Sequence, residues 1–265
     1  MIIGVTGSPG AGKSTLCDQL TRVLRGEGKT VGVIAVDPTS PYTGGAILGD
    51  RIRMQQHHSD PGVFIRSMAT RGWLGGLAAA TTEMTMLLDA AGFDAVIVET
   101  VGVGQDEVEI ARLADVTLVV MVPGMGDDVQ AIKAGIMEIA DVFVINKSDQ
   151  PGTEKLEREL TSYLTLSHRP DGWSPKIVRT VASDGKGIED LLAAAREYHD
   201  RGTSRARAAD IWKIRLREML RERLLDRFPE SDFAQAGRDV ADRKRDPYSV
   251  LHEWLQAPGI LAPEK

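Results

Sequence analysis

Seven short apolar runs, each followed by a segment suited to a helix, restrict this chain to few folds. The runs read IIGVT, VGVIAVD, VFIRSM, DAVIVET, VTLVVMV, DVFVIN and KIVRTVA. Continuous apolar strands that alternate with helical segments indicate a parallel sheet covered on both faces. The sequence therefore predicts an α/β fold with a doubly wound, mostly parallel sheet. In such sheets, ligands bind at the carboxyl ends of the strands.

The alternation ends near Arg201, which divides the chain into two predicted parts. Residues 1–201 carry all seven apolar runs. Residues 202–265 begin with the arginine-rich helical segment GTSRARAADIWKIRLREMLRERLLDRF and contain a short terminal helix around PYSVLHEWL. We expect an α/β domain at 1–201 and a helical C-terminal appendage at 202–265.

Composition excludes several classes of protein. Of the 265 residues, 42% are hydrophobic and 26% are charged, as in ordinary globular proteins. The formal net charge of -6 argues against indiscriminate binding to nucleic acid or to an anionic membrane. No apolar run approaches the length of a membrane span. The single cysteine, Cys17, allows no internal disulfide and fits a reducing compartment, so we expect a cytoplasmic protein.

The stretch GSPGAGKS fits the phosphate-binding pattern G-x-x-x-x-G-K-[ST] and lies between the first apolar run and a helix expected from Lys13. Its glycines let backbone N–H groups converge on phosphate oxygens, and the helix N-terminus adds a favourable dipole. Lys13 is expected to reach the β and γ phosphates, and Ser14 to bind Mg²⁺. The predicted nucleotide contacts in this loop are Gly7, Ser8, Pro9, Gly10, Ala11, Gly12, Lys13, Ser14 and Thr15.

Two carboxylates follow apolar runs and are candidates for the same metal ion. Asp37 ends VGVIAVD, and Glu99 ends DAVIVE. Each alone has a simpler explanation, because Asp37 precedes a proline in a turn and Glu99 can cap the next loop. Together with Ser14 they form an oxygen donor set, which Mg²⁺ prefers. We expect Ser14, Asp37 and Glu99 to hold Mg²⁺ directly or through its water molecules.

Three further residues are candidates for sensing or hydrolysing the γ phosphate. Gly102, three residues after Glu99, can offer a backbone N–H to that phosphate. Asp50 either approaches the metal or caps the helix that RIRM is expected to begin, and the sequence favours neither alternative. Gln105 either orients the attacking water or is a polar loop residue. The candidate catalytic residues are Lys13, Asp50, Glu99 and Gln105.

The stretch NKSD, residues 146–149, follows the apolar run DVFVI and predicts which base is bound. Asp149 can accept two hydrogen bonds from the N1 and N2 donors of guanine, which adenine does not offer. Asn146 would fix the loop, and the stem of Lys147 would pack on the base. Ala182 and Ser183, in TVASDGKGI, would lie near the guanine oxygen. We therefore expect GTP and GDP as ligands.

Several motifs along residues 1–200 point to one family when they are taken together. They are GSPGAGKST, VDPTSPYTGG, LGDRIRM, FIRSMATRGWLGGL, ETVGVGQ, PGMGDDVQAIKAGI and NKSD. With them the chain resembles the methylmalonyl-CoA mutase-associated GTPases, also called MeaB or ArgK. The resemblance implies the fold of P-loop GTPases and a GTP-hydrolysing chaperone that gates cofactor loading of an adenosylcobalamin-dependent acyl-CoA mutase. It also implies that residues 37–50, 99–107 and 124–133 transmit the nucleotide state to the mutase.

An apolar stripe in the C-terminal helix raises the question of what covers it. Its predicted members are Trp212, Leu216, Met219, Leu220, Leu224 and Phe228. Packing on the chain's own domain and a homodimer interface are both consistent with the stripe, and the resemblance favours a homodimer. Acidic residues alternate with the arginines of this helix, which argues against nucleic acid as a partner.

Two rival functions remain from the sequence, a metal-insertion GTPase and a kinase that passes the γ phosphate to a protein or metabolite. A metal-insertion protein is expected to carry a histidine-rich tract or a cysteine pair, and neither is present. His57 and His58 are adjacent, unlike a metal pair spaced by one helical turn, and are expected to be packed or solvated. Cys17 is expected to be a small buried hydrophobe without chemistry.

Overall fold

The structure is a computed structural model that describes residues 1–37, 55–57, 59–69, 79–100, 106–124, 137–167, 169, 171–201 and 204–257. The chain divides into two compact units, Met1–Arg205 and Ala206–Lys265. The division falls four residues beyond Arg201, where the alternation of apolar runs ends. Each unit is described by itself below.

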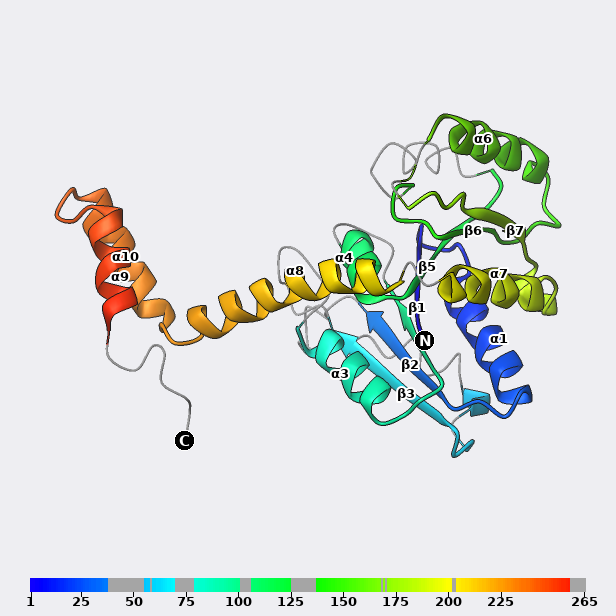
Figure 1. Ribbon diagram of the computed structural model, residues 1–265, viewed down its shortest axis with the longest axis horizontal. Helices are drawn as coiled ribbons and strands as arrows, with labels where there is room; N and C mark the ends of the chain where they lie inside the picture. Colours follow the sequence, from blue (N-terminus) through cyan, green and yellow to red (C-terminus); the bar gives the residue numbers. More distant parts are fainter. Residues whose placement is uncertain are drawn as a thin grey trace. The chain divides into compact units, whose positions relative to one another are not determined.

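In the described part of the first unit, seven strands form a single sheet (Figure 1). They are β1 (Ile2–Gly7), β2 (Val31–Asp37), β3 (Val63–Ala69), β4 (Ala95–Glu99), β5 (Val116–Met121), β6 (Val142–Ile145) and β7 (Lys176–Arg179). Their order is β3-β2-β4-β1-β5-β6-β7, and every neighbouring pair is parallel. The predicted doubly wound parallel sheet is confirmed, and each of the seven apolar runs forms a strand.

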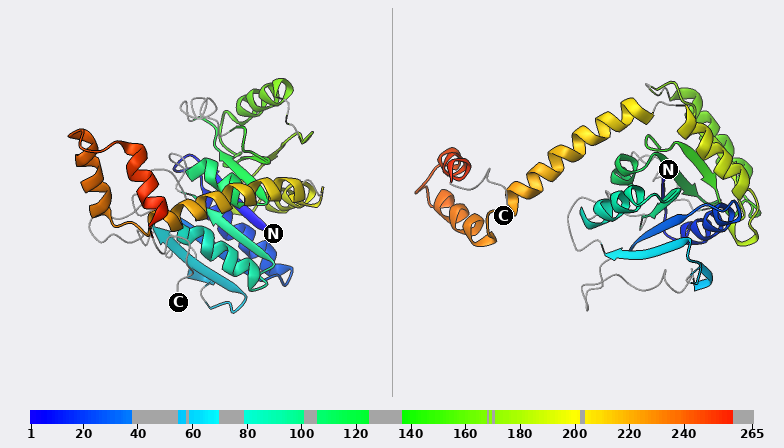
Figure 2. Two further views of the ribbon diagram at one scale, coloured as in Figure 1. Left: turned by 60° about the vertical axis from the view of Figure 1, so that its left-hand side comes forward. Right: turned by 60° about the horizontal axis from the view of Figure 1, so that its bottom comes forward.

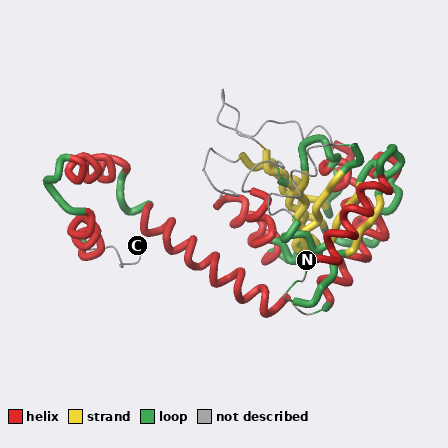
Figure 3. Tube along the Cα trace, turned by 90° about the horizontal axis from the view of Figure 1, so that it is seen from above, coloured by secondary structure: helices red, strands yellow, loops and turns green. Residues whose placement is uncertain are grey.

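Helices cover both faces of this sheet (Figures 2 and 3). On one face, α1 (Lys13–Gly26) and α7 (Ile188–Asp200) share a core with side chains such as Val5, Val33 and Leu118. On the other face, α3 (Ala79–Ala90) packs on β2 and β4, α4 (Asp106–Leu113) packs chiefly on β1, and α6 (Thr153–Leu166) packs on β5 and β6. Strands buried on both faces are apolar throughout, which explains why their sequences lack alternation.

Strand β1 lies at the centre of the sheet, between β4 and β5. From β1 the chain crosses to β2 on one side, whereas after β4 it continues to β5 on the other side. Ligands of open α/β sheets bind at the carboxyl ends of the strands beside such a reversal of direction. The loop that follows β1 therefore begins where a ligand is expected.

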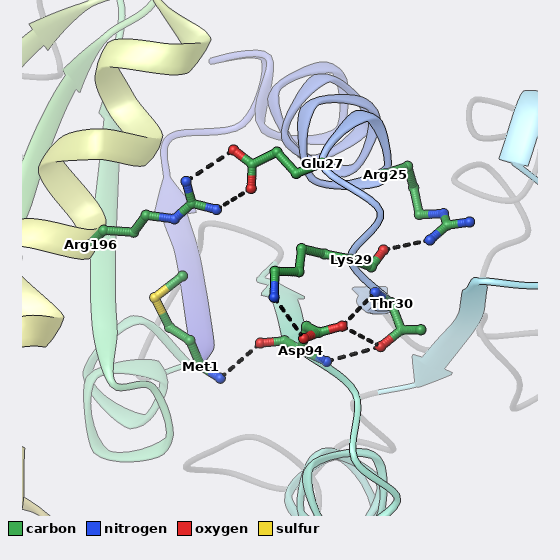
Figure 4. A network of polar contacts seen from close by, with 7 residues as sticks. All are labelled: Met1, Arg25, Glu27, Lys29, Thr30, Asp94 and Arg196. Carbon is green, nitrogen blue, oxygen red and sulfur yellow. Dashed lines mark hydrogen bonds and ion pairs between the residues drawn. The ribbon is translucent and has the colours of Figure 1, made fainter.

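A polar network fixes the opposite edge of the sheet, where β1, β2 and β4 begin (Figure 4). The Asp94 carboxylate accepts hydrogen bonds from the Thr30 backbone N–H at 2.8 Å and from its hydroxyl at 3.0 Å. Lys29 Nζ lies 3.2 Å from the other carboxylate oxygen. These contacts, the Thr30 backbone first among them, lower the pKa of Asp94 to about 2. The Met1 amino group donates to the Asp94 carbonyl, so three strand starts are joined.

The second unit is helical in its described residues, with α8 (Ser204–Leu225), α9 (Glu230–Ala241) and α10 (Pro247–Gln256). The Asp246 carboxylate caps α10 by accepting from the Tyr248 and Ser249 backbone N–H groups. Within the described residues, no helix has the length and apolar character that crossing a bilayer requires.

Five of the six residues predicted for the apolar stripe, from Trp212 to Leu224, lie within α8. Trp212, Leu216, Met219 and Leu220 have side chains that are 42%, 60%, 44% and 60% exposed on α8. Phe228 does not belong to the stripe, because α8 ends at Leu225 and the Phe228 ring stacks on Trp254 with 4.9 Å between ring centroids. Phe233 completes this aromatic cluster, which joins α9 and α10 to the end of α8.

Candidate functional site

The loop between β1 and α1 is shaped by three glycines with positive φ angles, Gly7, Gly10 and Gly12. Gly7 leaves no room for a side chain, because a Cβ there would lie 2.0 Å from the Val120 carbonyl oxygen on β5. At Gly12 the φ angle is 86° and α1 begins at the next residue. The loop therefore brings backbone N–H groups to the N-terminus of α1, which is the geometry of a phosphate site.

Lys13 and Ser14 form the first turn of α1 and are both buried. Lys13 Nζ donates to the Gly7 carbonyl at 2.7 Å and to the Ser8 carbonyl at 3.1 Å. The ammonium group is thus held inside the loop, beside the space that the backbone N–H groups surround. Thr15 is exposed on the same turn.

Ser14 also meets Glu99, although 85 residues separate them in the sequence. The Ser14 hydroxyl donates to Glu99 Oε1 at 2.8 Å, and the two residues are only 6% and 5% exposed. Glu99 lies beside the start of α1 because it ends β4, which is the neighbour of β1 in the sheet. Asp37 ends β2, whose Ala35 is paired with Glu99, so its backbone lies at the same edge of the sheet.

Ser14 and Glu99 fit a magnesium ion on chemical grounds. Both present oxygen atoms, they lie side by side at the carboxyl edge of the sheet, and Mg²⁺ is bound through one or two carboxylates and water molecules. A buried carboxylate is also costly without a cation or hydrogen-bond donors. Among the described residues, no cluster of three or more histidine, cysteine or acidic side chains forms a cation site of its own.

Asn146 connects the NKSD loop to the loop between β1 and α1. It follows β6 and is 2% exposed. Its Nδ2 donates to the Ala11 carbonyl at 2.8 Å, and its Oδ1 accepts from Thr180 Oγ1 and from the Ala182 N–H, both at 3.1 Å. One amide side chain therefore fixes the distance between the phosphate loop, the NKSD loop and the segment after β7.

Lys147 and Asp149 lie on the exposed side of the same loop. Lys147 has a φ angle of 54°, and its Nζ donates to the Gly10 carbonyl at 2.9 Å, so its stem crosses toward the phosphate loop. The Asp149 residue is exposed. Ser183 Oγ donates to Asp184 at 3.0 Å within the short helix η2 (Ala182–Asp184). The carboxylate that would read the base is thus open to a ligand.

The structure brings together most of the predicted site residues but does not describe all of them. Asp50, Gly102 and Gln105 lie outside the described residues, as does the Asp37 side chain. The roles predicted for these four residues stay predictions. His57, which was expected to be either packed or solvated, is packed. Cys17 is fully buried, as expected.

Thr180 is a contributor that sequence reasoning missed. Its hydroxyl orients the Asn146 amide, and its backbone carbonyl accepts from the Ser148 N–H at 3.0 Å. The only sequence signal was its place within the run KIVRTVA, at the start of TVASDGKGI. This signal does not show which loop the side chain would meet.

Three comparisons place the chain among known proteins. Residues 1–232 match the family model described as "Methylmalonyl Co-A mutase-associated GTPase MeaB". A Pyrococcus abyssi protein that is provisionally named a GTPase is 50% identical over 96% of this chain and 82% of its own length. GTPase ArgK of Escherichia coli is 41% identical over 83% of this chain and 68% of its own length.

A solved structure shares the fold over nearly the whole chain. It is the crystal structure of an LAO/AO transport system kinase, with a TM-score of 0.66 and 30% sequence identity. The match covers 97% of this chain and 80% of that protein.

Proposed function

The chain belongs to the family of methylmalonyl Co-A mutase-associated GTPases, MeaB, and is therefore a GTPase; from this premise we propose that it is the GTP-hydrolysing chaperone of an adenosylcobalamin-dependent acyl-CoA mutase. In this proposal GTP binding and hydrolysis control the loading and protection of the mutase's cofactor. The description of the family, which names association with the mutase, supports the choice of partner.

One observation carries the nucleotide part of this proposal, the bridge that Asn146 makes between the phosphate and base loops. Because Asn146 fixes both loops through hydrogen bonds of 2.8 and 3.1 Å, phosphates and guanine would be bound by one connected unit. The exposed Asp149 carboxylate would accept from guanine N1 and N2. Lys13, now donating to loop carbonyls, would exchange these acceptors for phosphate oxygens.

Ser14 and Glu99 would hold Mg²⁺, with Asp37 as a third candidate ligand. The ion would neutralise charge that develops on the phosphate oxygens. Lys13 would add a second positive charge on the same oxygens. Asp50 and Gln105 remain our candidates for organising the attacking water, and Gly102 for sensing the γ phosphate.

We test base selection by comparing GTP, ATP and XTP as ligands of the wild type and of Asp149→Asn. The wild type is expected to bind GTP at least about 100-fold more tightly than ATP, because adenine lacks the N1 and N2 donors that the Asp149 carboxylate would accept from. Asp149→Asn is expected to lose GTP affinity by about 100-fold and to gain XTP, whose carbonyl at position 2 accepts from the new amide. Equal binding of GTP and ATP by the wild type would contradict the assignment.

The fate of the γ phosphate separates the chaperone from a second candidate function. A kinase is favoured by the name of the 30% identical structure, an LAO/AO transport system kinase. GTP labelled in its γ phosphate is incubated with the protein, alone and with an acyl-CoA mutase. A chaperone releases labelled phosphate faster when the mutase is present, whereas a kinase transfers the label to a protein or metabolite. No response to any adenosylcobalamin-dependent mutase would count against the chaperone.

We further propose that the protein is a cytoplasmic homodimer. The buried free thiol of Cys17 is consistent with a reducing compartment. The exposed apolar side chains of α8 offer a surface for a second copy.

A further inference from the structure

Asp18 is a buried carboxylate outside the nucleotide contacts. It lies on α1 and is 7% exposed. Gln56 Nε2 donates to its two oxygens at 2.8 and 2.6 Å, and His57 Nε2 lies 3.1 Å from Oδ1. His57 is itself 8% exposed. These two side chains come from the short helix η1 (Gln55–His57), so Asp18 joins α1 to the segment that leads into β3.

Ser14, Asp18 and Arg25 share one face of α1. Residues spaced by four and by seven along an α-helix lie above one another. Ser14 meets Glu99 on β4, Asp18 meets Gln56 and His57, and Arg25 donates from Nε and from a terminal nitrogen to the two Asp60 oxygens, each at 2.8 Å. This face of α1 is therefore tied to its surroundings at three points along its length.

Of these three contacts, the one at Asp18 lies close enough to Ser14 along the helix to affect the position of Ser14. The distance from Asp18 to Ser14 along the helix axis is about 6 Å, one turn. A hydrogen-bonded helix is stiff over one turn, so a shift of α1 at Asp18 passes to Ser14. The Ser14–Glu99 contact of 2.8 Å leaves little room for such a shift.

We propose that Asp18 is a positioning residue for the metal site, which holds α1 so that the Ser14 hydroxyl stays beside Glu99. This inference rests on the proposed function, because it assumes that Ser14 and Glu99 bind the Mg²⁺ that accompanies the nucleotide. Asp18 touches neither the ion nor the nucleotide. Gln56 acts with it by donating to its carboxylate from the side of η1.

The test is the substitution Asp18→Asn, read out by the Kd of a fluorescent GDP analogue with saturating Mg²⁺ and with EDTA. Asparagine keeps the size of the side chain but turns an NH₂ donor toward the Gln56 donor. We expect the Kd in Mg²⁺ to rise about tenfold, the usual cost of losing a hydrogen bond to a charged group. The Kd in EDTA should change less than about twofold, because Ser14 acts through the metal.

Two further variants separate positioning from general loss of stability. Asp60→Asn weakens the tie to Arg25 at the other end of the same helix face, and should leave the Kd in Mg²⁺ unchanged. The double variant Asp18→Asn with Gln56→Glu reverses donor and acceptor, so it should recover most of the lost affinity. If Asp18→Asn does not fold, Gln56→Ala removes the same donor from an exposed residue and is expected to raise the Kd in Mg²⁺ about threefold.

Several results would overturn the inference. These are an unchanged Kd for Asp18→Asn in Mg²⁺, an equal loss in Mg²⁺ and EDTA, or the same loss for Asp60→Asn. In each of these cases the proposed metal site still stands as long as the wild type binds the nucleotide more tightly in Mg²⁺ than in EDTA. A wild type without that preference would instead refute the metal site and the positioning role together.

Discussion

Single residues set the geometry of the proposed nucleotide site through close contacts. Gly12 shows this most clearly. Its φ angle is 86°, and a Cβ added there would lie only 2.5 Å from the Asn146 amide nitrogen. A side chain at Gly12 would both strain the loop and push away the residue that joins the two nucleotide loops. The absence of a side chain at Gly12 therefore allows the Asn146 contact.

Gly12→Ala is therefore expected to lower the affinity for GDP and GTP alike, by at least about tenfold, since it costs strain and the Asn146–Ala11 hydrogen bond. Titration with a fluorescent nucleotide measures the loss. Gly26→Ala is the matched control, because a Cβ at this last residue of α1 meets nothing within 4 Å. The control should keep wild-type affinity, and a Gly12→Ala protein that did the same would contradict the expectation.

A second prediction at this scale concerns Glu99→Gln. The amide keeps an oxygen for the Ser14 hydroxyl, whose contact measures 2.8 Å, but removes the negative charge that attracts Mg²⁺. We expect the Mg²⁺ concentration needed for half-maximal GTP hydrolysis to rise about tenfold or more, with a smaller change in the thermal midpoint of unfolding. An unchanged Mg²⁺ requirement would exclude Glu99 as a metal ligand.

Secondary structure elements were predicted well where their signal is contiguous in the sequence. All seven strands and the start of α1 at Lys13 follow from local patterns, and so does the phosphate loop. Contacts between distant segments were not predictable in this way. The Asn146–Thr180 and Asp18–Gln56 hydrogen bonds join residues 34 and 38 positions apart, and no local spacing encodes them. Phe228 was misplaced for the same reason, since Trp254 decides where its ring packs.

At the amino edge of the sheet, Asp94 predicts how stability depends on pH. Its pKa of about 2 in the folded protein lies below the ordinary value of 3.8, so the ionised form stabilises the fold. This stabilisation is fully present above about pH 4 and is lost as the pH falls toward 2. Asp94→Asn should therefore lower the thermal midpoint at pH 7 but differ less from the wild type near pH 2. A difference that stays constant over this range would contradict the assignment.

The whole molecule combines the α/β unit, which carries the proposed nucleotide site, with a helical unit whose α8 exposes large apolar side chains. Leu216 and Leu220 are each 60% exposed and lie one turn apart. A second copy of the chain is the partner that we propose for this surface.

Leu216→Glu with Leu220→Glu is expected to convert a dimer into a monomer, because buried charges without partners oppose association. Light scattering after size exclusion measures the mass. Arg221→Glu, on another face of α8, is the control and should remain dimeric. GTP hydrolysis without the mutase should persist in the monomer, since the predicted nucleotide contacts lie within residues 7–183. A wild type that is monomeric at all concentrations would refute the dimer.

The central place of β1 has a consequence for synthesis on the ribosome. β1 is translated before both of its neighbours, Ala95–Glu99 and Val116–Met121, so it is enclosed only after they have emerged. The nascent chain cannot complete its sheet by adding strands one after another in order of translation. Until Val116–Met121 has been translated, β1 lacks one of the two strands that pair with its edges.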